Sequence, residues 1–218
     1  MSSRDLLHGI YERLFKHFGP QGWWPAESPF EICIGAILTQ NTNWQNVEKA
    51  IQNLKREGLL SPLALYHCPL EDLARLIRPC GYYNIKAKRV KNFVSFIVEG
   101  YQGALENLKK EEPSRLRERL LSIKGLGPET VDSILLYALE IPVFVVDAYT
   151  HRIMYRHGLV PEIISYQELQ EFFHSNLERD LNLFQEYHAL LVACGKTYCK
   201  KQNPQCPLCP LNNFDQEF

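Results

Sequence analysis

The feature that most constrains the fold of this chain is a helical spacing of apolar residues that recurs along almost its whole length. Residues 4–19 (RDLLHGIYERLFKHFG) place apolar side chains at i, i+3 and i+4 and stop at a glycine. Residues 29–58 contain one apolar helix, a polar break near Gln40 and a second helix. Alternating strand patterns are almost absent, and the β-like run Val143–Val146 is too isolated to pair. We expect an all-α fold with two helical lobes and a cleft between them.

Length and charge limit the classes of function. The 218 residues are enough to bury a core. The net charge of −1 excludes a polycation, so any nucleic-acid surface must be local. The first residues lack the apolar core of a signal peptide, and no stretch approaches the roughly 20 apolar residues of a membrane span. A cytoplasmic location without membrane attachment is the expectation.

Seven cysteines fall into two groups. Cys33, Cys68 and Cys80 are scattered and are interpreted as small core or surface residues. The other four follow the spacing C-x4-C-x6-C-x2-C near the end of the chain: Cys194, Cys199, Cys206 and Cys209. Such crowding in a cytosolic protein favours metal over disulfides. Zinc or an iron–sulfur cluster would suit four thiolates, and four unligated thiols are the alternative.

A glycine turn separates two apolar segments between Leu120 and Tyr149. Gly125 and Gly127 predict a backbone that needs positive φ or a close approach. Pro128 suits the first position of a helix that continues through Thr130. Backbone N–H groups at such a helix start could bind a phosphate. A plain helix–helix connection is the alternative.

Several motifs in one order resemble the helix-hairpin-helix DNA glycosylases of the endonuclease III superfamily. These are LTQNT at 38–42, CGYYNIKAKRVKNF at 80–93, the hairpin LLSIKGLGPETVDSILLYAL at 120–139, VFVVDAYTHRIMYRHGL at 143–159 and CKKQNPQCPLC at 199–209. The resemblance spans nearly the whole chain. It implies that Asp147, at the end of the Val143–Val146 run, is the catalytic residue.

The resemblance also implies how the protein would handle DNA. A glycosylase extrudes the damaged nucleotide and fills the gap, and Gln40 and Tyr82 match the family's inserting residues. The DNA-binding set is Gln40, Tyr82, Lys86, Lys88, Gly125, Gly127 and Thr130, where a solvated basic face is the alternative for the lysines. The expected partner is double-stranded DNA with a damaged base. We expect a monomer that associates with the nucleoid through DNA.

Asp147 has a chemical and a structural interpretation. A carboxylate in a water-poor cleft stabilises the positive charge that develops on the sugar, and it could orient or deprotonate water. It could also simply cap the helix that begins at Ala148. Both roles are compatible.

The chain departs from the bifunctional members of the family. Those members carry a lysine just after the hairpin that forms a Schiff base, and Glu129 stands at that position here. We therefore predict a monofunctional hydrolase. WWP at 23–25, an aromatic residue after QNT and the glutamate resemble the 3-methyladenine glycosylase branch. Its aromatic rings would attract a cationic base, and the predicted pocket is Trp23, Trp24, Pro25, Trp44 and Glu129.

The cluster loop departs as well. The family spacing is C-x6-C-x2-C-x5-C, whose first three positions match Cys199, Cys206 and Cys209 and whose fourth falls on Asp215. Either Asp215 ligates the iron, or Cys194 supplies the missing thiolate from the preceding helix end, or no cluster forms. We favour Cys194, because thiolate is the softer ligand. We expect a [4Fe-4S] cluster that holds a lysine-bearing loop against DNA.

Domains and competing functions complete the prediction. We expect one lobe from residues 1–22 and 112–218 with the iron–sulfur loop 194–209, a central lobe from 23–111, and the hairpin and aspartate segment 115–150 at the cleft. The alternatives are an endonuclease III-like glycosylase for oxidised pyrimidines with lyase activity, a non-catalytic DNA-binding module, and an iron–sulfur electron carrier.

Overall fold

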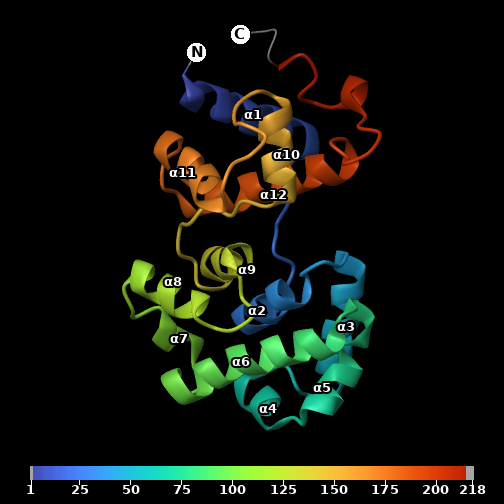
Figure 1. The fold of residues 1–218 in the computed structure, drawn as a ribbon, viewed down its shortest axis with the longest axis vertical. Coiled ribbons are helices and arrows are strands. Elements are labelled where there is room, and N and C mark those ends of the chain that lie inside the picture. Colours follow the sequence, from blue (N-terminus) through green and yellow to red (C-terminus); the bar gives the residue numbers. More distant parts are fainter. Residues whose placement is uncertain (1, 215–218) are drawn as a thin grey trace. The chain divides into compact units, whose positions relative to one another are not determined.

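The computed structural model describes residues 2–214, which form helices and connecting loops without any β-strand (Figure 1). The elements, in chain order, are α1 Ser3–Phe18, α2 Pro29–Leu38, α3 Trp44–Arg56, α4 Pro62–His67, α5 Leu70–Leu76, η1 Arg78–Cys80, α6 Tyr83–Tyr101, α7 Leu105–Leu108, α8 Pro113–Leu121, α9 Pro128–Ser133, η2 Ile134–Ala138, α10 Ala148–Arg156, α11 Tyr166–Asn176, α12 Leu181–Thr197 and η3 Cys206–Leu208. The predicted all-α fold is confirmed.

Contacts divide the chain into two compact units. The terminal unit contains the residues up to Trp23 and those from Pro142 onward, and the central unit is Trp24–Ile141. The lobes predicted from the sequence have their second boundary between residues 111 and 112. The prediction therefore puts α8 and α9 in the terminal lobe. The contacts instead put both helices, with the glycine hairpin between them, in the central unit.

The terminal unit is built around α12, which packs against α1 and α10, while α1 also packs against α11. Its core is aromatic: Phe144 stacks on Phe173 with ring centroids 3.9 Å apart, and Phe184 and Tyr187 meet Phe144 edge-on. The buried Tyr187 hydroxyl donates to the Leu7 carbonyl at 2.8 Å. Each fully buried ring of this kind contributes about 1.5–3 kcal/mol relative to an exposed one.

The central unit has α2 and α6 at its centre. Helix α2 contacts α3, α6, α9 and η2, and α6 is covered by α4 and α5. Eight of the ten residues of α2 are buried, which explains why its sequence is apolar on every side. Helix α9 continues directly into η2, a π-helical turn whose five residues are all buried.

Short polar side chains set many of the helix starts. Ser28, Asn43, Ser61 and Asp147 each accept a hydrogen bond from a backbone N–H in the first turn of the helix that follows. Within residues 2–214, no helix combines the length and the apolar character that crossing a membrane would require.

Candidate functional site

Asp147 is the N-cap of α10, so the capping interpretation of this residue is correct. Its Oδ1 accepts hydrogen bonds from the Thr150 N–H at 2.7 Å and from the Thr150 hydroxyl at 2.9 Å. Its side chain is 11% exposed. Thr150 thus uses only one of the two carboxylate oxygens.

The second oxygen, Oδ2, faces His188 of α12 at an Oδ2–Nε2 distance of 3.8 Å. Burial by itself would raise the pKa of Asp147, but the proximity and charge of His188 and the two Thr150 donors outweigh it and lower the pKa below 3.8. Asp147 is therefore ionised at neutral pH. Its stabilising effect on the fold is present above pH 3.8 and is lost as the pH falls through the lowered pKa.

The sequence analysis did not single out His188 and so missed this contact. His188 is buried on α12, in line with Phe184, Tyr187 and Leu191. Those positions follow the i, i+3, i+4, i+7 spacing of one helix face, so the periodicity of the segment could have identified His188 as facing inward.

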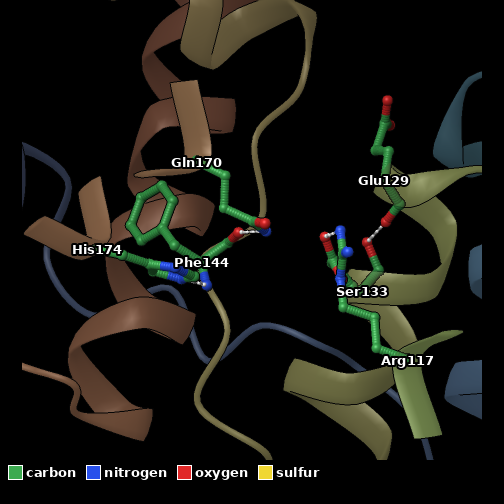
Figure 2. Close-up of polar contacts among 7 residues, drawn as sticks. Arg117, Glu129, Ser133, Phe144, Gln170 and His174 are labelled. Atoms are coloured by element: carbon green, nitrogen blue, oxygen red, sulfur yellow. Dashed lines mark hydrogen bonds and ion pairs between the residues drawn. The ribbon is translucent and has the colours of Figure 1, made fainter. Parts of the chain in front are cut away.

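The extended run before Asp147 has no strand partner among the described residues, yet the backbone of Phe144 within it is hydrogen-bonded on both sides. The Phe144 N–H donates to His174 Nε2 at 2.9 Å, and the Phe144 carbonyl accepts from Gln170 Nε2 at 2.7 Å. Figure 2 shows both side chains reaching Phe144 from α11. Since an unpaired buried backbone group is costly, these two bonds fix the path of the chain three residues before Asp147.

The glycine hairpin joins α8 to α9. Gly125 has φ +99°, and a Cβ there would lie 2.5 Å from Arg89 Cγ, so both the conformation and the space require glycine. Gly127 has φ −95°, and nothing lies within 4 Å of a Cβ built on it. The predicted need for glycine therefore holds at Gly125 and does not hold at Gly127.

A bidentate ion pair holds the two hairpin helices together. Arg117 of α8 donates from Nε to Asp132 Oδ1 at 2.6 Å and from its second terminal nitrogen to Oδ2 at 2.9 Å, and Asp132 is fully buried (Figure 2). The Ser133 hydroxyl donates to the Glu129 carbonyl at 2.7 Å, while the Glu129 residue itself is exposed at the start of α9. A paired and fully desolvated carboxylate of this kind orients α9.

Gln40 lies against the hairpin. Its Nε2 donates to the Gly125 carbonyl at 3.3 Å and to the Thr130 hydroxyl at 2.9 Å, and its Oε1 accepts from Arg89. Three residues of the predicted DNA-binding set, Gln40, Gly125 and Thr130, are thus brought together. The amide would have to exchange these bonds before it could enter a duplex.

Tyr82 is 71% exposed and has φ +46°, an unusual backbone conformation for a bulky residue. The preceding Gly81 also has positive φ, at 64°. A core tyrosine is excluded by this exposure. The ring lies on the protein surface just before α6, and its insertion into DNA stays a prediction.

The two lysines predicted to follow DNA phosphates differ sharply. Lys88 is exposed on α6. Lys86 is 1% exposed, and its ammonium donates to the carbonyls of Leu38 at 2.9 Å and Cys80 at 2.7 Å. A phosphate contact by Lys86 does not fit this burial, because both the side chain and its charge are already directed into the protein.

Part of the predicted aromatic pocket is assembled in the central unit. A cavity of about 550 Å³ is lined by Trp24, Pro25 and Trp44. The two indoles meet edge-on with centroids 5.3 Å apart. Trp23 belongs to the terminal unit, where the Lys196 ammonium lies 5.8 Å from its ring centroid. Glu129 is not among the residues that line this cavity.

Acidic residues that the sequence analysis missed complete the cavity wall. Glu48 accepts from the Trp44 indole N–H at 2.8 Å, and its spacing of four residues from Trp44 on α3 is the signal that could have found it. Glu27 and Glu31 also line the cavity and share the Lys55 ammonium at 2.9 and 3.0 Å. Three carboxylates and one ammonium give the cavity a net negative wall.

The four clustered cysteines all line one cavity of about 230 Å³ in the terminal unit. Cys194 and Cys209 have their sulfurs 3.8 Å apart, and the hydrogen bond from Cys194 lowers the pKa of Cys209 to about 7. No three His, Cys, Asp or Glu side chains of residues 2–214 converge as ligands of one metal ion. Thiols spread around a cavity suit a cluster, which binds each thiolate at a separate iron. Asp215 lies outside the described residues.

Comparison with known proteins gives a consistent result. Residues 34–179 match the family profile of the HhH-GPD superfamily base excision DNA repair proteins. A protein of Methanocaldococcus jannaschii, named as a candidate DNA repair glycosylase, is 48% identical and covers 96% of both chains. Endonuclease III of Thermotoga maritima is 34% identical over 85% of this chain and 81% of its own. The crystal structure of the H. pylori 3-methyladenine DNA glycosylase bound to 1,N6-ethenoadenine aligns with a TM-score of 0.77 and 32% identity, covering 90% of this chain and 98% of the other.

The contacts at Phe144 generate a stability prediction. Gln170→Leu keeps the volume of the side chain but leaves the Phe144 carbonyl without this donor, which should lower the free energy of unfolding by about 1–3 kcal/mol. Urea denaturation followed by circular dichroism measures the change. Gln167→Leu, at an exposed position of the same helix, is the control and should change stability by less than about 0.5 kcal/mol. Equal effects of the two variants would contradict the role given to Gln170.

Proposed function

Because the chain belongs to the HhH-GPD superfamily of base excision DNA repair proteins and is a DNA N-glycosylase, we propose that it releases alkylated purines of the 3-methyladenine type, with water as the nucleophile. The observation that carries this proposal is the state of Asp147. One oxygen is held by Thr150 in an ionised carboxylate that is 11% exposed.

The chemistry follows from that state. As the N-glycosidic bond breaks, positive charge develops on the sugar, and a fixed carboxylate in a poorly solvated site stabilises that charge more than one in bulk water. The oxygen not used by Thr150 can also orient the attacking water or accept its proton. The two Thr150 bonds preorganise the group, so little reorganisation is needed during the reaction.

The choice of water as nucleophile rests on Glu129. A Schiff-base mechanism needs an amine just after the hairpin, and a carboxylate cannot form that bond. The neighbouring Lys124 precedes Gly125 and lies on the other side of the turn, where its carbonyl accepts a hydrogen bond from Asn92 at 2.9 Å. Strand cleavage by a lyase step is therefore not expected.

The choice of alkylated purine rests on the central-unit cavity. Indole faces attract cations, and a methylated purine carries positive charge with a weakened glycosidic bond. The acids Glu27, Glu31 and Glu48 add negative charge to the same wall. The similarity to a solved 3-methyladenine glycosylase supports this choice. Oxidised pyrimidines are the second candidate, supported by the likeness to an endonuclease III.

A base-release assay tests the catalytic role and the substrate together. Duplexes carrying 3-methyladenine, 7-methylguanine or thymine glycol are incubated with protein, and the free base is identified by chromatography. We expect release of methylated purine. Asp147→Asn keeps a side-chain oxygen for Thr150 and therefore keeps the cap, but it should slow release by about 100- to 1,000-fold because the charge is lost.

Each other outcome of this assay has a meaning. Release of thymine glycol would favour the second candidate. If the wild type releases no base from any of these substrates, and Asp147→Asn leaves DNA binding unchanged, the result would indicate a non-catalytic DNA-binding module.

A trapping experiment tests the monofunctional mechanism. A Schiff-base intermediate is reduced by borohydride to a covalent protein–DNA adduct, whereas hydrolysis by water leaves none. We expect no adduct when the wild-type protein, its substrate duplex and borohydride are combined and resolved on a denaturing gel. A strong adduct would contradict the role given to Glu129 and would point to another lysine as nucleophile.

A [4Fe-4S] cluster held by Cys194, Cys199, Cys206 and Cys209 is the cofactor that the donor set fits. When bound, such a cluster would cross-link the loop to the end of α12. The chain's own contacts already tie this loop to α10: Arg152 Nε donates to the Cys199 carbonyl at 2.6 Å, and Arg156 donates to the Lys200 carbonyl at 2.9 Å. The loop would thus present Lys200 and Lys201 near the helix that Asp147 caps.

Iron content tests the ligand set. Cys194→Ser should lower the iron per chain and the visible absorption of anaerobically purified protein, because it removes one thiolate from the cavity. Cys68→Ser, at a buried cysteine of the central unit, should leave both unchanged. Full iron in the Cys194 variant would exclude Cys194 as a ligand and favour Asp215.

A further inference from the structure

Lys86 joins the two loops that carry the candidate inserting residues. Its ammonium donates to the carbonyl of Leu38, the last residue of α2, and to the carbonyl of Cys80, the last residue of η1. Leu38 lies two residues before Gln40, and Cys80 lies two residues before Tyr82. One buried cation therefore sets the position of both loops at the point where each leaves its helix.

Arg89, one helical turn further along α6, continues the connection. It donates to Gln40 Oε1 and packs so closely on Gly125 that no Cβ would fit there. Gln40 in turn donates to the hairpin at Gly125 and Thr130. The Tyr82 loop, the Gln40 loop and the hairpin are thus linked through two cations of one helix.

We infer that Lys86 is a positioning residue for base extrusion, which fixes the relative placement of Gln40 and Tyr82 without touching DNA. This inference rests on the proposed function for the insertion of these two residues. A flexible pair of loops would have to be ordered each time DNA binds, and preorganisation avoids that loss of conformational freedom. A charge-assisted bond to each carbonyl is stronger than a neutral one.

The energetics of burial support this role over a phosphate contact. Burial lowers the pKa of Lys86, an effect that the nearby Arg89 charge reinforces and Cys80 opposes. An ammonium kept in such a place despite the cost of desolvation is held by specific partners, here the two carbonyls. Lys88, two residues away and exposed, is the position from which a phosphate could be reached.

Amine labelling of the wild-type protein tests the placement without any substitution. The native protein is treated with an acetylating reagent, with and without an undamaged duplex, and each lysine is followed by mass spectrometry. We expect Lys86 to resist labelling in both cases, and Lys88 to be labelled in free protein and protected by DNA. Rapid labelling of Lys86 in free protein, at the rate of Lys88, would overturn the inference.

Matched variants then test the role. Lys86→Met and Lys88→Met are compared for DNA affinity as a function of salt, for extrusion reported by 2-aminopurine fluorescence, and for single-turnover base release. Lys88→Met should reduce the slope of log K against log salt by about one phosphate contact. Lys86→Met should leave the slope unchanged and reduce extrusion and base release by on the order of 10- to 100-fold.

The outcomes separate the possible roles of Lys86. A reduced salt slope in Lys86→Met would mean that it contacts phosphate, and normal extrusion in a folded Lys86→Met protein would mean that its role is purely structural; either result overturns the inference. If Lys86→Met does not fold, the labelling experiment decides. Labelling, salt slope and extrusion do not depend on base release, so a failure of the proposed activity would be recognised separately.

Discussion

The site depends on how the chain satisfies a buried, extended backbone that has no strand beside it. At Phe144 the N–H and the carbonyl are both bonded to side chains of α11, four residues apart on that helix. Because His174 Nε2 accepts the N–H, this imidazole must present an unprotonated nitrogen, which fixes its tautomer. An apolar segment can then run through the aromatic core of the terminal unit and end in a single carboxylate at a helix start. The buried apolar run therefore sets the position of the acid that follows it.

The central unit applies the same physical rule with a cation. Lys86 bonds to the carbonyls at the ends of α2 and η1, and Lys91 bonds to three carbonyls at the end of α4, those of Leu65, Tyr66 and Cys68. A lysine near a helix C-terminus satisfies carbonyls that have no intrahelical partner and complements the helix dipole. In the basic run of α6, Lys86 and Lys91 therefore stabilise the fold, whereas Lys88 lies on the surface. This fits a chain whose net charge is only −1.

The sequence could predict the parts of this molecule that local chemistry dictates. Helical periodicity gave the all-α class, the glycine turn gave the hairpin, and Asp147 before Ala148 gave the cap. The helical spacing of Val90, Phe93 and Ile97 places Lys86, and not Lys88, on the buried face of α6, but it could not predict which carbonyls the Lys86 ammonium would bind. The partners of Phe144 lie 26 and 30 residues along the chain, so no local pattern reveals them. Of the carboxylates around Trp44, Glu48 could have been found from its spacing on α3, whereas Glu27 and Glu31 precede that helix and share no local pattern with Trp44.

Charge is the physical reason for the proposed substrate, a cationic base. A methylated purine is already activated as a leaving group, so the protein needs to attract the base and stabilise the sugar, and it has less need of a covalent nucleophile. In the proposed function, the aromatic faces and the acids around the Trp24–Trp44 cavity would meet the first requirement, and an ionised Asp147 would meet the second. Because Glu129 does not line that cavity, its part in the proposal is chemical and not selective: a carboxylate just after the hairpin cannot form a Schiff base, so water is the proposed nucleophile.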